Sequence, residues 1–350
     1  MLVGLVIHPS RPEAAAAAEI AKRICAERDV RHVTVDVWSD ERPCRELVTG
    51  LLERMDLVLT IGGDGTLLRG LDVAVAAGAP VLGVNAGRLG FLTQFTTADL
   101  ATVLAAAIGG NVMTVDRMLL TLRASRFPRV PADLDGLLRF GGGSPSAHRP
   151  DEAADAGWGV PLPLTALNDV VLEKVGRDRQ ASLAVYISGR LFASYSADAV
   201  VIATSTGATA YSFAAGGPVL SPRLDAMVFT PVAPHMAFNR SIVVAPDEPI
   251  GVRVLDRSGP VAVVLDGRVQ GVLDPGDWVA VFPAARRACL IVPEHEDFFG
   301  RLRERFSLAD APAAVADTDH ALPLLLRSRI PLPDDLLRLH LAPPEEPELI

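Results

Sequence analysis

The stretch DLVLTIGGDGT, residues 56–66, indicates the class of fold to expect. Residues 56–61 are mostly apolar and partly β-branched, which predicts a buried strand. The strand runs directly into Gly62-Gly63-Asp64-Gly65, and Thr66–Ala77 then predicts a helix that Gly78 ends. A buried strand followed at once by a glycine loop and a helix is typical of a parallel sheet that binds ligands beyond the carboxyl ends of its strands.

The same alternation of strand and helix extends over the N-terminal third of the chain. The predicted elements are strands at Leu2–Ile7, Val33–Val37 and Pro80–Val84 and helices at Pro12–Arg28, Asp40–Glu53 and Ala98–Ile108, the last with Thr97 as its N-cap. Short continuous apolar strands that alternate with helices predict a doubly wound, Rossmann-like α/β domain over residues 1–117.

After Arg117 the pattern changes to short alternating strands, which predict a mostly antiparallel β domain over residues 118–287. Ser188-Gly189 and Asp266-Gly267 are signals of two-residue hairpin turns, and one short helix is expected at Ala208–Ala215. Residues 124–163 are rich in Gly, Pro and Ala and are expected to form a surface insertion. Residues 307–350 are rich in proline and end in acidic residues, so they are expected to form a C-terminal tail.

Charge and composition exclude several classes of partner. The chain has 350 residues, with 33 Lys and Arg against 42 Asp and Glu, so its net charge is −9. This balance argues against generic binding to nucleic acid or to anionic membranes, and leaves room for a local basic pocket. No apolar run approaches the ~18 residues of a membrane span. Three scattered cysteines and seven dispersed histidines predict neither a disulfide framework nor a structural zinc site, and we expect a cytoplasmic protein.

Asp64 is the informative residue of the glycine loop. Glycines at the end of a buried strand let backbone N–H groups approach phosphate oxygens, and the start of the next helix favours negative charge. A carboxylate there repels phosphate unless it has another role, such as accepting a proton from an attacking hydroxyl or helping to hold Mg²⁺. The alternative is that Asp64 only caps the helix. The loop matches neither GxxxxGK[ST] nor GxGxxG in its usual context.

Two further segments follow predicted buried strands. GVNAGRLGFL at 83–92 adds a second glycine loop at the same sheet edge, with one cation, Arg88. TSTGATAYSFAAGGP at 204–218 places hydroxyls at the start of a short helix, where they suit phosphate or ribose, and Tyr211 offers a face for a ring. The alternatives are an ordinary βα connection for the first segment, and a capped helix with a core tyrosine for the second.

Asn168-Asp169 is a polar pair within a predicted strand, Ala166–Glu173, where it is costly unless both side chains are satisfied. Asparagine amides suit base edges and ribose hydroxyls, and aspartate accepts hydroxyl protons, while a turn or an edge strand is the alternative explanation. Asp198 is a further carboxylate between two predicted strands. Asp266-Gly267-Arg268 is more simply a type I′ turn.

Taken together, in this order and spacing, these motifs resemble the NAD kinase family of ATP- or polyphosphate-dependent enzymes. The matching segments are GGDGT at 62–66, GVNAGRLGFL at 83–92, LNDVVLEK at 167–174, ADAVVIATSTGATAYSFAAGGPVLSP at 197–222 and FFGRLRERF at 298–306. GGDGT alone is shared with lipid kinases and is similar to a motif of phosphofructokinases, whereas the segment at 197–222 is far more specific. The resemblance covers nearly everything from Leu2 to Phe306.

The resemblance implies both a fold and a set of roles. It implies that residues 288–306 return to the first domain, and that Asp64 is the catalytic aspartate that activates the 2′-hydroxyl of the adenosine ribose of NAD. Gly65 and its neighbours would cradle diphosphate. The implied nucleotide and NAD contacts are Gly62, Gly63, Gly65, Thr66, Asn85, Asn168, Asp169, Arg179, Asp198, Thr206, Thr209, Ala210, Tyr211, Ser212, Phe213, Ala214 and Arg268.

The implied substrates are NAD and either ATP or polyphosphate, with Mg²⁺ carried by the phosphate donor and no metal ligands assigned in the chain. We expect a homo-oligomer, either a dimer or a tetramer. The chain departs from the family pattern in TPTGSTAY, where Ser205 replaces Pro and Ala208 replaces Ser. Asp169 stands where the family has Glu, and Ala199 where it has Gly. None of these changes removes Asp64, so they bear on substrate detail and turnover more than on the type of reaction.

Two other functions compete with this reading. A lipid kinase could share GGDGT, but it should offer an apolar or basic surface for membranes, against which the net charge of −9 argues. A non-catalytic regulator that binds a dinucleotide is compatible with the motif substitutions, but the intact GGDGT argues against it. Formation of NADP from NAD, ATP and Mg²⁺ separates the three functions.

Overall fold

The computed structural model describes residues 1–38, 55–87, 90–129, 158–176, 180–294 and 296–308. Residues Met1–Phe298 form one compact unit, and residues Phe299–Ile350 form another, of which α7 (Phe298–Arg305) is the described helix. The predicted helix at 40–53 and the predicted tail beyond residue 308 lie outside the described residues. Among the described residues, no helix has the length and apolar character needed to cross a membrane.

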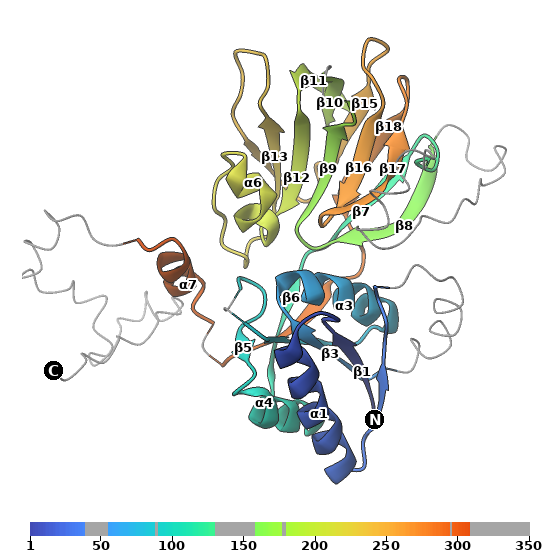
Figure 1. Cartoon of the computed structure of the whole chain (residues 1–350). Helices are drawn as coiled ribbons and strands as arrows, with labels where there is room; N and C mark the ends of the chain where they lie inside the picture. The colour runs from blue at the N-terminus through green and yellow to red at the C-terminus, as the bar shows by residue number, and fades with distance from the viewer. Residues whose placement is uncertain (39–54, 88–89, 130–157, 177–179, 295, 309–350) are drawn as a thin grey trace, which may run out of the picture. The chain divides into compact units, whose positions relative to one another are not determined.

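The N-terminal region is built on a seven-stranded sheet in the order β2-β1-β3-β4-β19-β6, with β5 beside β4 (Figure 1). All neighbouring strands pair in parallel except β6, which is antiparallel to β19. The strands are β1 (Leu2–Ile7), β2 (Arg31–Thr34), β3 (Leu57–Gly62), β4 (Val81–Asn85), β5 (Phe95–Thr96), β6 (Met113–Arg117) and β19 (Ala288–Val292).

Helices cover both faces of this sheet. Alternate residues of a strand point to opposite faces, and in β1 Val3 and Leu5 pack with α1 (Pro12–Glu27) and α4 (Leu100–Ile108). Leu2 and Val6 pack on the other face, in the cluster that holds α3 (Asp64–Ala77). The predicted doubly wound α/β domain is therefore confirmed.

The ends of two helices test the capping predictions. Gly78 ends α3 in the left-handed conformation, with φ +67°, as predicted. The prediction that Thr97 caps the next helix is wrong, because α4 starts at Leu100 with Asp99 in the capping position. The Thr96 amide and hydroxyl donate to Asp99 Oδ2 at 2.8 and 2.7 Å, so a tight turn over residues 96–99 delays the helix.

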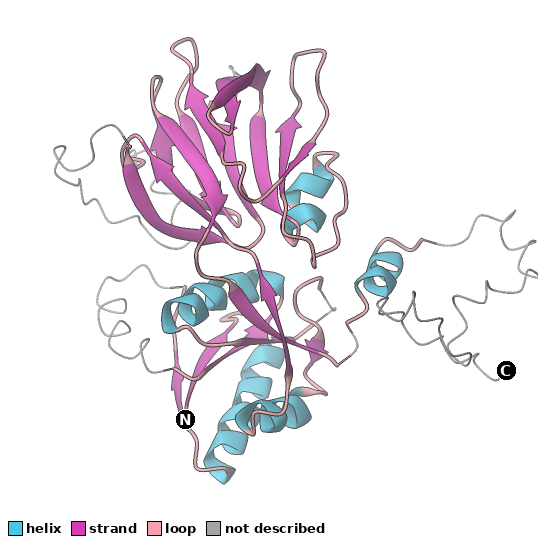
Figure 2. Ribbon diagram, turned by 180° about the vertical axis from the view of Figure 1, so that it is seen from behind, coloured by secondary structure: helices cyan, strands magenta, loops and turns pink. Residues whose placement is uncertain are grey.

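The C-terminal region consists of two six-stranded antiparallel sheets that pack face to face (Figure 2). The first has the order β11-β10-β15-β18-β7-β8 and the second the order β14-β13-β12-β9-β16-β17. The strands of the first sheet are β7 (Leu120–Ala124), β8 (Val160–Ala166), β10 (Ala181–Ile187), β11 (Arg190–Ala197), β15 (Ile250–Val254) and β18 (Trp278–Pro283). Those of the second are β9 (Asp169–Lys174), β12 (Ala199–Thr204), β13 (Met227–Val232), β14 (Ile242–Val244), β16 (Val261–Leu265) and β17 (Arg268–Leu273).

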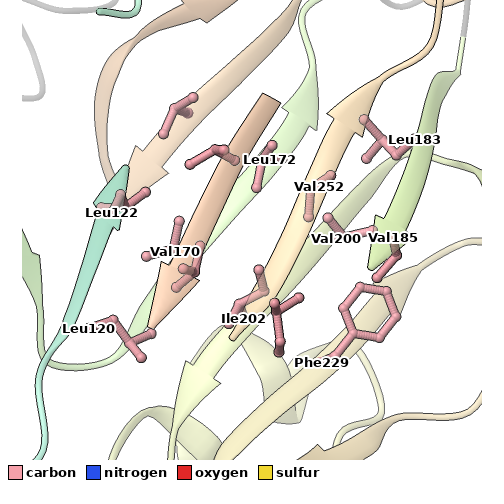
Figure 3. Close-up of a cluster of buried hydrophobic side chains, with 14 of the residues drawn as sticks. Leu120, Leu122, Val170, Leu172, Leu183, Val185, Val200, Ile202, Phe229 and Val252 are labelled. Carbon is pink, nitrogen blue, oxygen red and sulfur yellow. The ribbon is translucent and has the colours of Figure 1, made fainter. Parts of the chain in front are cut away.

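The core of this sandwich lies between the two sheets (Figure 3). The second sheet contributes residues such as Val170, Ile202 and Phe229, and the first sheet contributes Leu122 and Val185. The far face of the second sheet is buried as well, in a cluster that contains residues of β9, β12, β13 and β16. Because both faces of β9 are apolar, its position is fixed from two sides, and so is the loop from which it starts.

The chain between β8 and β9 differs from the prediction. The predicted strand Ala166–Glu173 is in fact the end of β8 and most of β9, which belong to different sheets. Leu167 and Asn168 carry the chain from one sheet to the other. Buried strands lie on both sides of this crossing, so the sequence is apolar before and after it. The segment therefore resembles one continuous strand.

The hairpin turns agree with prediction. Ser188 and Gly189 have φ of 50° and 75°, and Asp266 and Gly267 have φ of 46° and 75°. Two consecutive residues with positive φ are the mark of a type I′ turn.

The expected surface insertion at 124–163 is wrong at both ends. Arg126 and Arg129 form ion pairs with Asp274 at 2.9 and 2.8 Å, and Arg129 also bridges to Val272 through the backbone. At the other end, residues 160–163 belong to β8. Residues 130–157 lie outside the described residues.

The division of the chain into domains follows from the sheets. Because β6 ends at Arg117 in one sheet and β7 begins at Leu120 in another, we propose a boundary near residue 117. A second proposed boundary lies near residue 287, since β19 pairs with β4 and β6 of the first sheet.

We predict that residues 131–156 are dispensable for folding. Replacing them with a short Gly-Ser linker should leave the melting temperature within about 2 °C of the parent, because their Gly-, Pro- and Ala-rich composition is typical of a surface loop. Replacing 126–161 instead also removes two arginine ion pairs and the start of β8, and should lower it by at least about 4 °C. Thermal unfolding followed by circular dichroism measures both. An equal loss in the two variants would contradict the prediction.

Candidate functional site

Asp64 lies in the first turn of α3, at the carboxyl edge of the parallel sheet. β3 ends at Gly62, and Gly63 is the capping residue of α3. The alternative reading of Asp64 as an N-cap is therefore wrong. Gly62 is required by packing, since a β-carbon there would lie 2.2 Å from Thr66 Oγ1. The Thr66 side chain is buried at 2% exposure, and its hydroxyl has no hydrogen-bond partner among the described residues.

Gly65, in contrast, is not required by the packing of the chain. Among the described residues, a β-carbon at Gly65 would meet nothing within 4 Å, and one at Gly63 would meet only the guanidinium of Arg11, at 3.8 and 3.9 Å. Glycine inside a helix costs roughly 0.5–1 kcal/mol relative to alanine. The start of α3 is thus open on the side where its first N–H groups have no partner within the helix, which is a geometry that suits an anion.

The Asp64 carboxylate holds the loop that follows β4. Oδ2 accepts the Phe91 amide at 2.9 Å, and Oδ1 accepts the Thr93 amide and hydroxyl at 3.0 and 2.8 Å. The Leu92 amide adds a longer hydrogen bond of 3.3 Å to Oδ1. A carboxylate offers about four lone-pair positions, two on each oxygen. Oδ1 accepts three of these four hydrogen bonds and Oδ2 accepts one, so the described residues leave one position on Oδ2 for a substrate proton.

Asn85 completes this network. It ends β4, is only 3% exposed, and donates from Nδ2 to Thr93 Oγ1 at 2.7 Å. Thr93 in turn donates to Asp64, so the asparagine, the threonine and the aspartate form one chain of hydrogen bonds. Gly90 makes room for it, since a β-carbon there would lie within 2.0–2.3 Å of the Asp64 carboxylate.

The polar pair Asn168-Asp169 lies where the chain crosses between the two sheets of the sandwich. The Asp266 carboxylate accepts the amides of Leu167, Asn168 and Asp169 at 2.8, 2.8 and 3.1 Å. The Asn168 carbonyl accepts the Thr204 amide at 2.9 Å. The backbone on either side of the asparagine is therefore fixed from both neighbouring strands of the sheet.

The segment at 204–218 packs directly on this crossing. The Thr204 hydroxyl donates to the Leu167 carbonyl at 2.5 Å and accepts the Gly207 amide at 3.0 Å. Glycine is obligatory at 207, because a β-carbon would lie 1.9 Å from the Asn168 carbonyl oxygen. Two of the predicted motifs are thus joined through their backbones.

The helix predicted at Ala208–Ala215 is broken in two. A 3₁₀ turn, η2 (Gly207–Thr209), is followed by α6 (Tyr211–Ala214), with Ala210 between them outside helical geometry, at φ −97° and ψ −127°. Tyr211 and Phe213 are 39% and 37% exposed, so both rings are accessible. Ser212 is fully buried, and its hydroxyl forms a hydrogen bond with Thr230 Oγ1 at 2.9 Å, so its side chain is engaged within the protein.

Four carboxyl groups gather in this half of the site. Burial, and then the charge of Asp266, raise the pKa of Asp169 to about 7, against a hydrogen bond from the Tyr211 amide. Burial raises the pKa of Asp266 to about 6, although its backbone hydrogen bonds and Arg268 oppose the shift. Burial raises the pKa of the Tyr211 hydroxyl, and the charges of Glu173, Asp169 and Asp198 raise it further. The three carboxylates therefore lie near that hydroxyl. Asp198 also pairs with Lys174 Nζ at 2.5 Å.

Arg268 connects the two halves of the site. Its Nη1 lies 2.5 Å from Asp72 Oδ2 on α3, and its charge also acts on Asp266. Leu167 adds an apolar connection, because it shares a buried cluster with Leu71 of α3. The helix that begins with Asp64 is thereby joined to the turn that carries Asn168-Asp169.

The structure places the remaining predicted residues as follows. Thr206 and Thr209 are partly buried, and the Thr209 hydroxyl donates to the Thr206 carbonyl at 3.4 Å. Ala214 is exposed. Arg179 and Arg88 lie outside the described residues. No group of three or more His, Cys, Asp or Glu side chains that could hold a metal ion occurs among the residues that are described.

Sequence reasoning missed three residues of this site. Asp266 carried the signal of a type I′ turn, which it does form, and nothing local reveals that its carboxylate binds a segment 97 to 99 residues earlier. Thr93 lies just after the quoted glycine loop. Arg11 directly precedes Pro12, which marks the start of a helix, and nothing local in the sequence shows that the arginine lies against Gly63 and Gly87.

The chain matches two family models, described as the ATP-NAD kinase N-terminal domain over residues 3–112 and the ATP-NAD kinase C-terminal domain over residues 167–292. It is 54% identical over 346 residues to NAD kinase 1 of Streptomyces avermitilis, covering 97% of this chain and 96% of that protein. It is 53% identical over 347 residues to NAD kinase 1 of Streptomyces coelicolor, covering 98% and 95%.

Two solved structures have a similar fold. Yeast NADH kinase complexed with NADH superposes with a TM-score of 0.72 at 21% identity, covering 89% of this chain and 88% of that chain. An NAD kinase from Archaeoglobus fulgidus in complex with ATP gives 0.63 at 21% identity, covering 89% and 100%.

We predict that Asp169→Asn stabilises the empty protein at high pH. The folded-state pKa of Asp169, about 7, lies above the ordinary 3.8. Its contribution to stability is therefore complete below about pH 4 and is lost as the pH rises to about 7. Asparagine stays neutral and can still accept the Tyr211 amide, so the melting temperature at pH 8 should rise by at least about 2 °C.

At pH 4 this gain should vanish. Asp99→Asn is the control of opposite sign, because hydrogen bonds from Thr96 lower the pKa of Asp99; it should bring no gain at pH 8. A gain from Asp169→Asn that is the same at both pH values would contradict the assignment to charge burial.

Proposed function

The chain belongs to the NAD kinase family, and on that premise we propose that it transfers the terminal phosphoryl group of ATP to the 2′-hydroxyl of the adenosine ribose of NAD. The observation that carries this proposal is the geometry at Asp64. A carboxylate with one available position on Oδ2 adjoins a helix start that is open to an anion.

The proposed reaction is a phosphoryl transfer at this edge of the sheet, in which Asp64 accepts a proton. The ribose 2′-oxygen attacks the γ-phosphorus and forms a new P–O bond, while its proton passes to Asp64 Oδ2. The bond between the γ-phosphorus and the bridging oxygen breaks, and ADP leaves with the electron pair. Catalysis of this kind depends mainly on positioning and on stabilising charge. Asp64 meets the first requirement, because the Phe91 and Thr93 amides fix its orientation.

The proposed NAD site lies in the other half, at the crossing between the sheets. Asn168, Asp169 and Asp198 offer an amide and carboxylates to ribose hydroxyls and a base edge, and the exposed Tyr211 and Phe213 offer rings for stacking. Thr206, Thr209, Ala210 and Ala214 border the same short helical segment. The similar yeast structure is an NADH kinase that holds NADH, which supports a dinucleotide as the acceptor here.

The proposed donor site lies at the start of α3, where Gly62, Gly63, Gly65 and Thr66 would surround the donor's phosphates. The similar Archaeoglobus structure holds ATP, which favours ATP, with polyphosphate as the alternative donor. We propose that Mg²⁺ arrives with the donor and neutralises phosphate charge when bound. A cytoplasmic homo-oligomer, dimer or tetramer, remains part of the proposal.

We predict that Asp64→Asn lowers kcat by about 10²–10⁴-fold, the usual contribution of a positioned general base. NADP formation from NAD, ATP and Mg²⁺ is the assay. Because Asp64 also holds the loop at 91–93, a variant that weakens the loop alone is needed. Thr93→Val removes one hydrogen bond to Asp64 and keeps the carboxylate.

Thr93→Val should lower kcat far less than Asp64→Asn does. It removes the hydroxyl that bonds Asp64 and Asn85, but it leaves the Phe91 and Thr93 amides that orient the carboxylate. If it were as harmful as Asp64→Asn, the carboxylate would act through the loop and not as a base. If the parent protein formed no NADP, the reaction itself would be wrong.

We predict that Asn168→Ala and Asp169→Ala each weaken NAD binding by about 1–3 kcal/mol, the range for losing one buried polar partner. Affinity for ATP should change little, since ATP is assigned to the start of α3. Asn111→Ala and Asp247→Ala are matched controls, because both side chains are exposed. Calorimetric titration of NAD and of ATP measures all four. Unchanged NAD affinity in both site variants would remove these residues from the acceptor site.

A further inference from the structure

Arg11 brings a cation to the start of α3. It follows β1 and is the residue that precedes α1. β1, β3 and β4 are neighbours in the parallel sheet, so the loops that follow them meet at one edge. Arg11 therefore belongs to the same edge as Gly63 and Gly87, although it comes from a different part of the sequence.

The guanidinium lies over both glycine loops. A β-carbon at Gly63 would be 3.8 and 3.9 Å from its Nη1 and Nη2, and one at Gly87 would be 3.2 Å from Nη1. Any other residue at 87 would press on the arginine. The two glycines thus leave the planar fork of Arg11 lying against exposed backbone beside the first turn of α3.

No described residue forms a hydrogen bond or an ion pair with the Arg11 side chain. Asp64 directly follows Gly63, but its carboxylate accepts hydrogen bonds from the amides of residues 91–93. Asn85 Oδ1 is buried without a partner, and it lies 3.5 Å from the same point above Gly87 that is 3.2 Å from Arg11 Nη1. The asparagine oxygen and the guanidinium therefore border the same space above Gly87, and the guanidinium N–H groups are left for a ligand.

Two more basic groups lie at this edge. The pKa of His8 is lowered by burial and then by the positive charges of Arg11 and Arg69, so all three groups act on one another. Arg69 is stacked on the Trp38 ring, 4.1 Å from its centroid. In a chain with a net charge of −9, the two arginines concentrate positive charge near the site assigned to the donor, while the lowered pKa of His8 favours its neutral form.

We infer that Arg11 is a catalytic residue of the phosphoryl transfer, which binds the terminal phosphoryl group of the donor across the Gly63 and Gly87 loops. The inference rests on the proposed function and deepens it. A guanidinium presents parallel N–H donors that match two phosphate oxygens, and its charge offsets the charge that spreads over the phosphoryl oxygens during transfer. Arg11 neither gains nor loses a proton, so the bonds that form and break are those of the proposed reaction.

The test uses Arg11→Met, which keeps the length of the side chain and removes its charge, and Arg11→Lys, which keeps the charge and removes the fork. Arg23→Met is the matched control. Arg23 lies within α1, the helix that follows Arg11, about 18 Å further along at 1.5 Å per residue, and is exposed. Steady-state NADP formation gives KM for ATP, KM for NAD and kcat for each variant.

Arg11→Met should raise KM for ATP and lower kcat/KM for ATP by about 10–100-fold, the usual effect of losing a charge-assisted contact to phosphate. Arg11→Lys should recover part of that loss. KM for NAD should stay within about 2-fold, and Arg23→Met should behave as the parent does. An unchanged kcat/KM for ATP in Arg11→Met would overturn the inference, and so would an equal rise of both KM values.

Calorimetry with inorganic tripolyphosphate and with AMP, each with Mg²⁺, separates the phosphate contact from contacts to the nucleoside. Arg11→Met should lose tripolyphosphate affinity and keep AMP affinity, whereas the reverse result would place Arg11 at the nucleoside and overturn the inference. Failure of the proposed function is distinguishable. If the proposed function is wrong, the parent protein itself forms no NADP. If only the inference about Arg11 is wrong, the parent forms NADP and Arg11→Met has the same kinetic constants as the parent.

Discussion

The carboxylate of Asp266 binds three consecutive backbone amides, and the geometry of the site depends on this interaction. The amides belong to Leu167, Asn168 and Asp169, at the point where the chain leaves one sheet and enters the other. Backbone N–H groups at such a crossing have no ladder partner, and an unpaired buried amide is costly. One carboxylate satisfies all three groups at once and sets the direction in which the two polar side chains project.

The same carboxylate transmits its position to the other half of the site. The positive charge of Arg268 acts on the Asp266 carboxylate. Arg268 also forms an ion pair with Asp72, which lies two turns after Asp64 along α3. Asp64 in turn fixes the loop at 91–93 through its hydrogen bonds to backbone amides. The proposed acceptor and donor regions are therefore tied through Asp266, Arg268 and Asp72. A displacement at one region would be felt at the other through this chain of contacts.

What the sequence predicts correctly is local in origin. Gly78 ends its helix and Ser188-Gly189 forms its turn because each residue's own backbone preference decides the outcome. The sequence does not predict the interruption between β8 and β9, because residues far away in the chain cause it. Asp266 binds the backbone there, and β8 and β9 pair with strands of different sheets. Arg11 was missed for the same reason. Its proximity to Gly63 and Gly87 exists only once three parallel strands are adjacent.

The charges of the site are separated in a way that gives the two nucleotides different places. The charges of Glu173, Asp169 and Asp198 act on the Tyr211 hydroxyl, and the charge of Asp266 acts on Asp169, so this half of the site is rich in carboxyl groups. Such groups accept hydrogen bonds from ribose hydroxyls but repel a triphosphate. His8, Arg11 and Arg69 lie at the sheet edge, where the open helix start adds to the positive potential. In the proposed reaction this charge pattern draws a donor rich in phosphate to the edge and away from the crossing. An acceptor whose reacting group is a neutral hydroxyl can approach from the acidic side. The separation of charge would therefore orient the two substrates before Asp64 acts as the proposed base.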